Sequence, residues 1–278
     1  MTLRRLLGLL SVAVTATALV GCGGDTLSFD PVAKAASQTA GSSSSRVAFA
    51  ANMSADGVGA MSFSGNGVYD GRTKSGSLSM KFNLPADAAA QLGGNPTMDM
   101  IFDGRHGFVM YMRSAMFRPL PPDTWVKMDL GKLADKAGVD LNALMNANQA
   151  DPSQTLRMLM ASSDTHVVNY NRVRGVFTTH YTLKIDLKEL AKKNKDLRKS
   201  LEQIMKMSGI DSYPAEAWID DQGNVRRLKV DMSFNMPTGA AFTMSITEEL
   251  YDFGVRASIK PPTGRHVVDM SALLGASS

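Results

Sequence analysis

Cysteine is almost absent from this chain: among its 278 residues only Cys22 is a cysteine, so no disulfide can join two parts of it. Aromatic residues are also few, at 7%, and no tract interleaves them with arginine or lysine, which excludes the usual pattern of a nucleic-acid-binding protein. The formal charge is only +4, and Arg4 and Arg5 supply two of these charges. A chain of this length must therefore be stabilised by a hydrophobic core.

The motifs of the common enzyme classes are absent as well. The chain has no Gly-x-Ser-x-Gly nucleophile elbow, no phosphate-binding loop and no His-Glu-x-x-His helix. Its histidines show no spacing, with one another or with the cysteine, that would indicate a metal site; they are His106, His166, His180 and His266. We therefore expect a protein that is not an enzyme and has no catalytic residue, metal or cofactor.

Two polar features have ordinary structural explanations. His180 lies on the more polar side of an expected strand, and we interpret it as a solvated or hydrogen-bonded strand residue. Asp220 and Asp221 could form a carboxylate pair, but they adjoin Gln222-Gly223-Asn224. Because aspartate and asparagine readily bond their own backbone in turns, we interpret this stretch as a turn.

The amino terminus has the pattern of a secretory signal. Arg4 and Arg5 precede an apolar run over residues 6–20, which is too short for a transmembrane helix. The sequence Leu19-Val20-Gly21-Cys22 resembles a bacterial lipoprotein signal. The resemblance implies cleavage before Cys22, a thioether lipid on its sulfur and acylation of the new amino terminus, for example with palmitate. The alternatives are an ordinary signal peptide followed by a free thiol, or an uncleaved anchor.

The expected domains follow from this interpretation. Residues 1–21 are the signal peptide, residues 22–29 are a lipidated tether, and residues 30–278 form a single domain. Several acyl chains on one residue hold a protein firmly at a membrane. We therefore expect a lipid-anchored protein on the extracytoplasmic face of the cell membrane, in the cell envelope.

Most of the domain has the two-residue period of half-buried strands. After a short helix that begins at Asp30-Pro31, this period dominates residues 46–130 and indicates an antiparallel meander. Helical spacing is expected over residues 130–145, 151–160 and 187–208, and strands over 176–185, 215–220, 225–234 and 241–250. This order predicts an α+β fold with one curved antiparallel sheet and helices packed on its concave face.

Several motifs in the second half resemble a known family. In order they are Asp151-Pro152-Ser153-Gln154-Thr155-Leu156, then Gly175-Val176-Phe177-Thr178-Thr179-His180-Tyr181, then Tyr213-Pro214-Ala215-Glu216-Ala217-Trp218-Ile219-Asp220. This order is similar to that of the actinobacterial LppX/LprG lipoproteins, whose fold is related to the LolA/LolB carriers. The likeness is best over residues 151–234. It implies a half-barrel whose helices enclose an apolar cavity for the acyl chains of a lipid or glycolipid.

The chain has 19 methionines, and several of them alternate with polar residues on the early strands. Methionine is flexible and polarizable, which suits an apolar surface that adapts to varied ligands. The alternating residues either form a closed core or line a lipid-sized pocket. The candidate cavity residues are Met80, Phe82, Met98, Met100, Phe102, Phe108, Met110 and Met112.

The helix expected over residues 187–208 carries lysines opposite its apolar stripe, among them Lys192, Lys193, Lys195 and Lys199. Such a face is ordinarily solvated. The alternative is a basic face toward anionic lipid headgroups.

These patterns predict a non-enzymatic, membrane-anchored lipoprotein that binds lipid or glycolipid acyl chains for transport within the cell envelope. An envelope transporter is an expected partner, and nucleic acid is not. The alternative is a structural or sensory surface lipoprotein whose half-barrel is filled by its own side chains and binds a protein partner.

Overall fold

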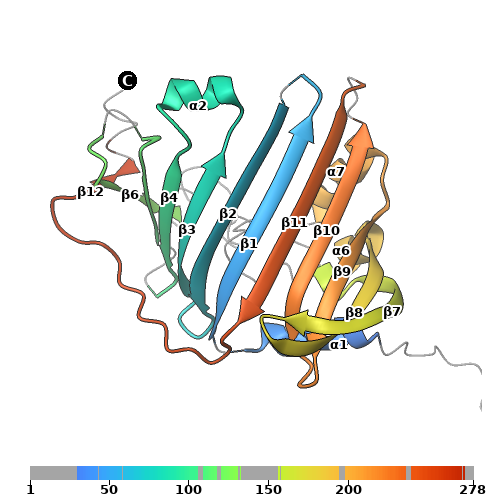
Figure 1. The fold of residues 1–278 in the computed structure, drawn as a ribbon. Helices are drawn as coiled ribbons and strands as arrows, with labels where there is room; N and C mark the ends of the chain where they lie inside the picture. Colours follow the sequence, from blue (N-terminus) through green and yellow to red (C-terminus); the bar gives the residue numbers. More distant parts are fainter. Residues whose placement is uncertain are drawn as a thin grey trace, which may run out of the picture.

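The computed structural model describes residues 30–42, 44–57, 59–105, 109–117, 120–130, 132, 156, 158–193, 198–235, 239–270 and 272. These residues form one 12-stranded sheet with short helices around it (Figure 1). The helices are α1 (Pro31–Ala40), α2 (Ala86–Leu92), α6 (Leu187–Lys193) and α7 (Arg198–Ser208). The strands are β1 (Ser44–Ala55), β2 (Gly59–Asp70), β3 (Ser75–Asn83), β4 (Thr97–Asp103), β5 (Val109–Ser114), β6 (Trp125–Asp129), β7 (Ser162–Val173), β8 (Val176–Asp186), β9 (Ser212–Asp220), β10 (Val225–Asn235), β11 (Ala241–Tyr251) and β12 (Val267–Asp269).

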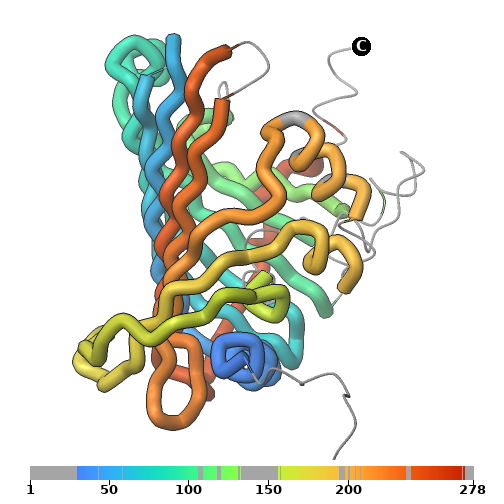
Figure 2. Tube along the Cα trace, turned by 90° about the vertical axis from the view of Figure 1, so that its right-hand side faces the viewer, coloured from blue at the N-terminus to red at the C-terminus, as the bar shows by residue number. Residues whose placement is uncertain are grey.

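The sheet is a long antiparallel ribbon joined in its middle by strands far apart in sequence. Its order is β12-β6-β5-β4-β3-β2-β1-β11-β10-β9-β8-β7, so that β1 pairs with β11. The edge strands β12 and β7 do not meet, and Figure 2 shows both flanks of the sheet bending to the side on which α1, α6 and α7 lie. The predicted α+β class with a single curved sheet is confirmed. One pair departs from it, because β12 runs parallel to β6.

A closed core lies between the helices and the β8–β10 half of the sheet. Because strand residues two apart share a face, one side of these strands is mostly apolar. Val32 and Ala36 of α1, which are completely buried, pack on this side together with Leu190 of α6 and Leu201 of α7. The strand residues of this core include Leu183, Ile185, Ala215, Ala217, Leu228 and Val230.

Helix α1 begins where the sequence predicts. Asp30 caps it, because Oδ1 accepts hydrogen bonds from the backbone N–H groups of Val32 (2.8 Å) and Ala33 (3.3 Å). The other carboxylate oxygen accepts from Ser162 Oγ (2.8 Å) and Thr165 Oγ1 (2.7 Å) of β7. Asp30 therefore caps the first helix and also links it to the edge strand β7.

Three elements differ from the expectation. Helix α2 was not expected within the strand-rich half, and its alanine-rich sequence follows Pro85 and ends at Gly93, which adopts a left-handed conformation. Strand β7 was not expected either, because its polar and exposed residues lack a two-residue apolar pattern. The segment over residues 187–208, expected as one helix, contains two, α6 and α7.

The helices expected over residues 130–145 and 151–160 lie mostly outside the described residues. Within that part of the chain Leu130, Lys132, Leu156, Met158 and Leu159 are helical.

Candidate functional site

The strand register brings most of the candidate cavity residues onto one face of the sheet. Met80 of β3 pairs with Met98 of β4, and Met100 pairs with Met112 of β5. Phe102 pairs with Met110, and Phe82 lies two residues after Met80 on the same strand. Of the eight candidates, Phe108 lies outside the described residues.

The same face continues across six strands, and we call it the apolar face. Its aromatic rings form a chain across β1, β2 and β3: Phe49 lies 5.9 Å from Phe63, and Phe63 lies 6.0 Å from Phe82, measured between ring centroids. The face consists of Phe49, Met53, Met61, Phe63, Met80, Phe82, Met98, Met100, Phe102, Met110, Met112 and Met128.

The apolar face is not closed in the way that the core beneath β8–β10 is. Met80 and Phe102 are 9% and 3% exposed, and Val126 and Ala51, which the register places on the same side of the sheet, are also buried. The other methionines and phenylalanines of the face are only half-buried. A contiguous run of half-buried methionine and phenylalanine side chains on a curved sheet is the kind of surface that apolar ligands contact.

Gly76, which has no side chain, leaves room for the Phe102 ring to lie over β3. Gly76 of β3 stands between Tyr69 of β2 and Phe102 of β4. The Phe102 ring occupies the space where a Cβ on Gly76 would be, and it stacks on Tyr69 with 5.9 Å between ring centroids. The face is therefore continuous over a position that has no side chain.

A second row of methionines was missed by sequence reasoning. Met61, Met53, Met244 and Met232 are direct cross-strand neighbours on β2, β1, β11 and β10. Alternation along each strand could have placed each of them on an apolar side. Their assembly into one row depends on the pairing of β1 with β11, which no local pattern indicates.

A hollow of about 720 Å³ lies over β1, β2, β10 and β11. It is lined partly by this methionine row and partly by polar residues of the opposite face, including the cross-strand neighbours Ser62, Asn52, Ser245 and Asp231. None of the candidate cavity residues lines this hollow. Its size falls in the range of small-molecule sites, and its lining combines the methionine row with these polar side chains.

His180 is a buried, hydrogen-bonded residue of β8 and not a solvated one. Its Nε2 lies 2.7 Å from Glu216 Oε2, and its ring stacks on Trp218 with 4.1 Å between centroids. His166 contacts Asp164 and His266 contacts Asp123, while His106 lies outside the described residues. Among the residues described, no group of three or more potential ligands is arranged to hold a metal ion.

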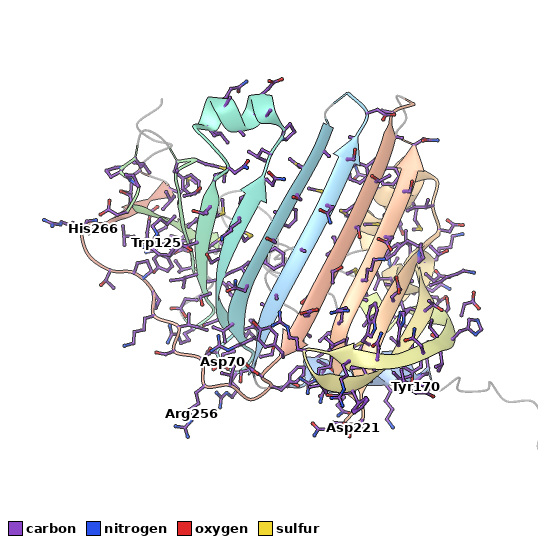
Figure 3. All side chains as sticks on the ribbon, viewed as in Figure 1. Asp70, Trp125, Tyr170, Asp221, Arg256 and His266 are labelled. Carbon is purple, nitrogen blue, oxygen red and sulfur yellow. The ribbon has the colours of Figure 1, made fainter. Side chains whose placement is uncertain are left out.

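Asp220 performs the turn role that the sequence predicts. Its Oδ1 accepts from the backbone N–H groups of Gln222 (3.1 Å) and Asn224 (2.8 Å), and its Oδ2 accepts from Arg226 Nε (2.6 Å). Asp221 beside it is exposed and points away from the fold (Figure 3). The two carboxylates therefore do not form a catalytic pair.

The basic residues of α6 are largely engaged within the protein. Lys192 Nζ donates to Glu189, Lys188 Nζ contacts Asp211 Oδ2 at 2.7 Å, and Lys193 Nζ donates to the Met160 carbonyl at 2.8 Å. Lys195 lies outside the described residues, and Lys199 is exposed on α7. Within the part of the chain that the structure describes, no helix has the length and apolar composition that a membrane span needs.

Comparisons with known proteins give distant relatives. No family model matches the chain. A 31.2 kDa protein of Streptomyces griseus from the rplA–rplJ intergenic region is 25% identical over 207 residues, which are 72% of this chain and 66% of that protein. The chain thus spans just under two thirds of the length of this relative.

Three solved structures match the chain over most of its length. LprF of Mycobacterium bovis is 14% identical with a TM-score of 0.47, and the match covers 84% of this chain and 96% of LprF. The lipoprotein LppX of Mycobacterium tuberculosis is 14% identical with a TM-score of 0.36 and coverage of 83% and 100%. A LolA-superfamily protein of Nitrosomonas europaea is 8% identical with a TM-score of 0.27 and coverage of 80% and 93%.

Proposed function

We propose that this protein is an envelope lipoprotein that binds the acyl chains of a lipid or glycolipid against the apolar face of its half-barrel and carries them between partners. The observation that supports this most directly is the half-buried state of Met98, Met100, Met110 and Met112, in contrast to the closed core beneath β8–β10. Each methylene group that such a surface removes from water contributes about 0.8 kcal/mol.

The chemistry of the face suits an acyl chain better than a polar ligand. Its members are thioether and phenyl side chains from strands β1–β6. Ser114, which pairs with Met98 at the edge of this face, already donates its hydroxyl to the Thr97 carbonyl at 2.7 Å. Affinity on such a surface depends on apolar area, so lipids with different headgroups can share it.

In this proposal residues 1–21 are removed, Cys22 carries the lipid anchor, and residues 30–278 form the lipid-binding domain. The protein needs no catalytic group, because transfer requires only that acyl chains be shielded from water. A transporter in the envelope is the partner that such a carrier would load from or deliver to.

Tryptophan substitution on the apolar face tests the proposal. Met110→Trp adds volume where we expect a lipid chain to lie, so lipid binding should fall while the free energy of unfolding changes by less than about 1.5 kcal/mol. Tyr111→Trp is the matched control, because Tyr111 is the next residue and faces the opposite side of β5. Solvent extraction and mass spectrometry of lipid that co-purifies with the Cys22→Ser protein measure binding, and urea titration measures stability.

The alternative is a half-barrel that is filled by its own side chains and binds a protein partner. Under that alternative Met110→Trp overpacks a closed core and lowers stability by several kcal/mol, and no lipid co-purifies with either protein. That result would reject the carrier function.

A further inference from the structure

Exposed large hydrophobic side chains gather on a single hairpin. Among the described residues, Val167 (52% exposed), Val168 (49%), Tyr170 (76%) and Phe177 (64%) have this character, and all belong to β7 or β8. Exposed apolar residues that cluster in this way mark interaction surfaces. Figure 2 shows the end of this hairpin, in yellow, projecting past the sheet on the side away from the helices.

The apolar residues share their surface with arginines. Arg172 pairs with Phe177 across the hairpin, and its guanidinium lies 3.5 Å from the centroid of the Phe177 ring. Tyr170 lies two residues before Arg172 on the same face of β7. Arg174, in the turn between the strands, lies 4.0 Å from the centroid of Tyr251. We call Val167, Val168, Tyr170, Arg172, Arg174 and Phe177 the hairpin tip.

The hairpin tip has a positive surplus of charge. Arg174 and Arg227 share one carboxylate, Glu249, and the Arg174 Nε–Glu249 Oε2 distance is 2.7 Å. Arg172 donates to the Gly175 carbonyl, which carries no charge. When exposed Asp221 on the adjacent β9–β10 turn and the Arg46–Asp252 pair beside Tyr251 are included, four arginines face three acids.

The start of the domain lies beside this hairpin. Asp30 bonds to Ser162 and Thr165 of β7, and Tyr170 follows Thr165 by five residues, or about 17 Å along the strand. Residues 23–29 can span at most about 26–29 Å between Cys22 and Asp30. The hairpin tip is therefore within reach of any membrane that holds Cys22.

We propose that the hairpin tip is a second membrane contact, whose aromatic rings enter the interface of an anionic bilayer while Arg172 and Arg174 meet its headgroups. Tyrosine and other amphipathic groups favour this boundary, and basic residues are drawn to anionic lipid surfaces. The acyl anchor limits distance from the bilayer, and the tip fixes which end of the half-barrel faces it. This inference rests on the proposed anchor at Cys22.

A fluorescent reporter on the full acylated protein tests the contact. Val168→Cys places a single labelling site on the tip without removing Tyr170 or Phe177, and Ala86→Cys on exposed α2, at the other end of the sheet in Figure 1, is the matched control. In vesicles of phosphatidylcholine with phosphatidylglycerol, spin-labelled lipid should quench a bimane at position 168 and leave one at position 86 unaffected. Phe177→Ser, and Arg172→Gln with Arg174→Gln, should each reduce the quenching, and added salt should weaken it.

Two results would overturn the proposal. Equal quenching at positions 168 and 86 would mean that the tip stays in water. A blue shift at position 168 without vesicles would mean that a second copy of the chain covers the tip. Membrane fractionation tests the anchor at Cys22 separately, and labelling of a free Cys22 thiol would refute that anchor. Quenching at position 168 on added vesicles would still show whether the hairpin tip contacts the bilayer.

Discussion

Buried aspartates at the strand ends close three of the hairpins, and each binds an arginine in the turn or at the start of the next strand. Asp70 contacts Arg72 and Asp103 contacts Arg105, as Asp220 contacts Arg226. Burial by itself would raise the pKa of Asp70, but the hydrogen bonds and charge of Arg72 lower it below its usual value. These carboxylates are structural, and the Asp-Gly pairs at 70–71 and 103–104 and the Gly-Asn pair at 223–224 are sequences that favour turns.

Replacing Asp220 should lower the stability of the fold. Its side chain is 1% exposed and that of Arg226 is 15% exposed, so Asp220→Ala leaves a half-buried guanidinium and two backbone N–H groups without their acceptor. We expect a loss of about 3–5 kcal/mol in the free energy of unfolding. Asp221→Ala, the exposed neighbour, should change it by less than about 0.5 kcal/mol. Urea titration of both variants measures this, and equal losses would contradict the assignment.

Glu249 should make stability depend on pH. Burial raises its pKa, but hydrogen bonds and charge from Arg227 and Arg174 outweigh this and lower the pKa below its usual value. The folded protein therefore gains stability above the usual glutamate pKa, and this gain is lost as the pH falls through the lower folded value. Unfolding free energies of the native protein and Glu249→Gln should differ most near pH 7 and converge in acid. A constant difference from pH 7 to pH 3 would refute this.

At the scale of the elements, Gly76 determines how β2, β3 and β4 fit together. A methyl group at this position would overlap the Phe102 ring, which is 3% exposed and stacked on Tyr69 and so cannot move aside. Gly76→Ala should destabilise the protein by about 1–3 kcal/mol. In a Phe102→Leu background the same substitution should cost much less, because the ring is gone. A thermodynamic cycle from urea titrations measures this coupling, and simple additivity of the two changes would disprove it.

The elements also show what the sequence could predict. Strands β1–β6 and β8–β11 alternate between apolar and polar residues, because one side faces an apolar interior, and that alternation predicts them within a few residues. Strand β7 lies at the edge and is exposed on both sides, so it has no alternation to recognise. Helix α2 is seven residues long and has no buried residue, so it has no apolar stripe.

The candidate site was predictable to the same extent. Period two was enough to select Met98, Met100, Met110 and Met112 as residues of one face, because side-chain direction on a strand is a local property. The row formed by Met53 and Met244 was not predictable, since it depends on which distant strands become neighbours.

At the scale of the whole molecule, the anchor decides where the apolar face operates. Cys22→Ala removes the sulfur that the lipoprotein signal would modify. We expect the protein to leave the membrane fraction or to persist as an uncleaved precursor. Cell fractionation with mass spectrometry of the amino-terminal peptide measures this. Native protein without acyl modification, found in the soluble extracellular fraction, would contradict the anchor.

The pairing of β1 with β11 has a consequence for how the protein folds. Val47 and Leu250, neighbours in the middle of the sheet, are about 200 residues apart in the chain. Closing so long a loop is entropically costly, and pairings between distant segments form slowly. The β1–β6 meander can assemble early from local contacts, but its inner edge at β1 stays open until β11 arrives. During that interval the nascent chain has an unpaired strand edge beside an apolar surface, which makes it prone to aggregation. The chain is therefore most prone to aggregate in the interval before β11 pairs with β1.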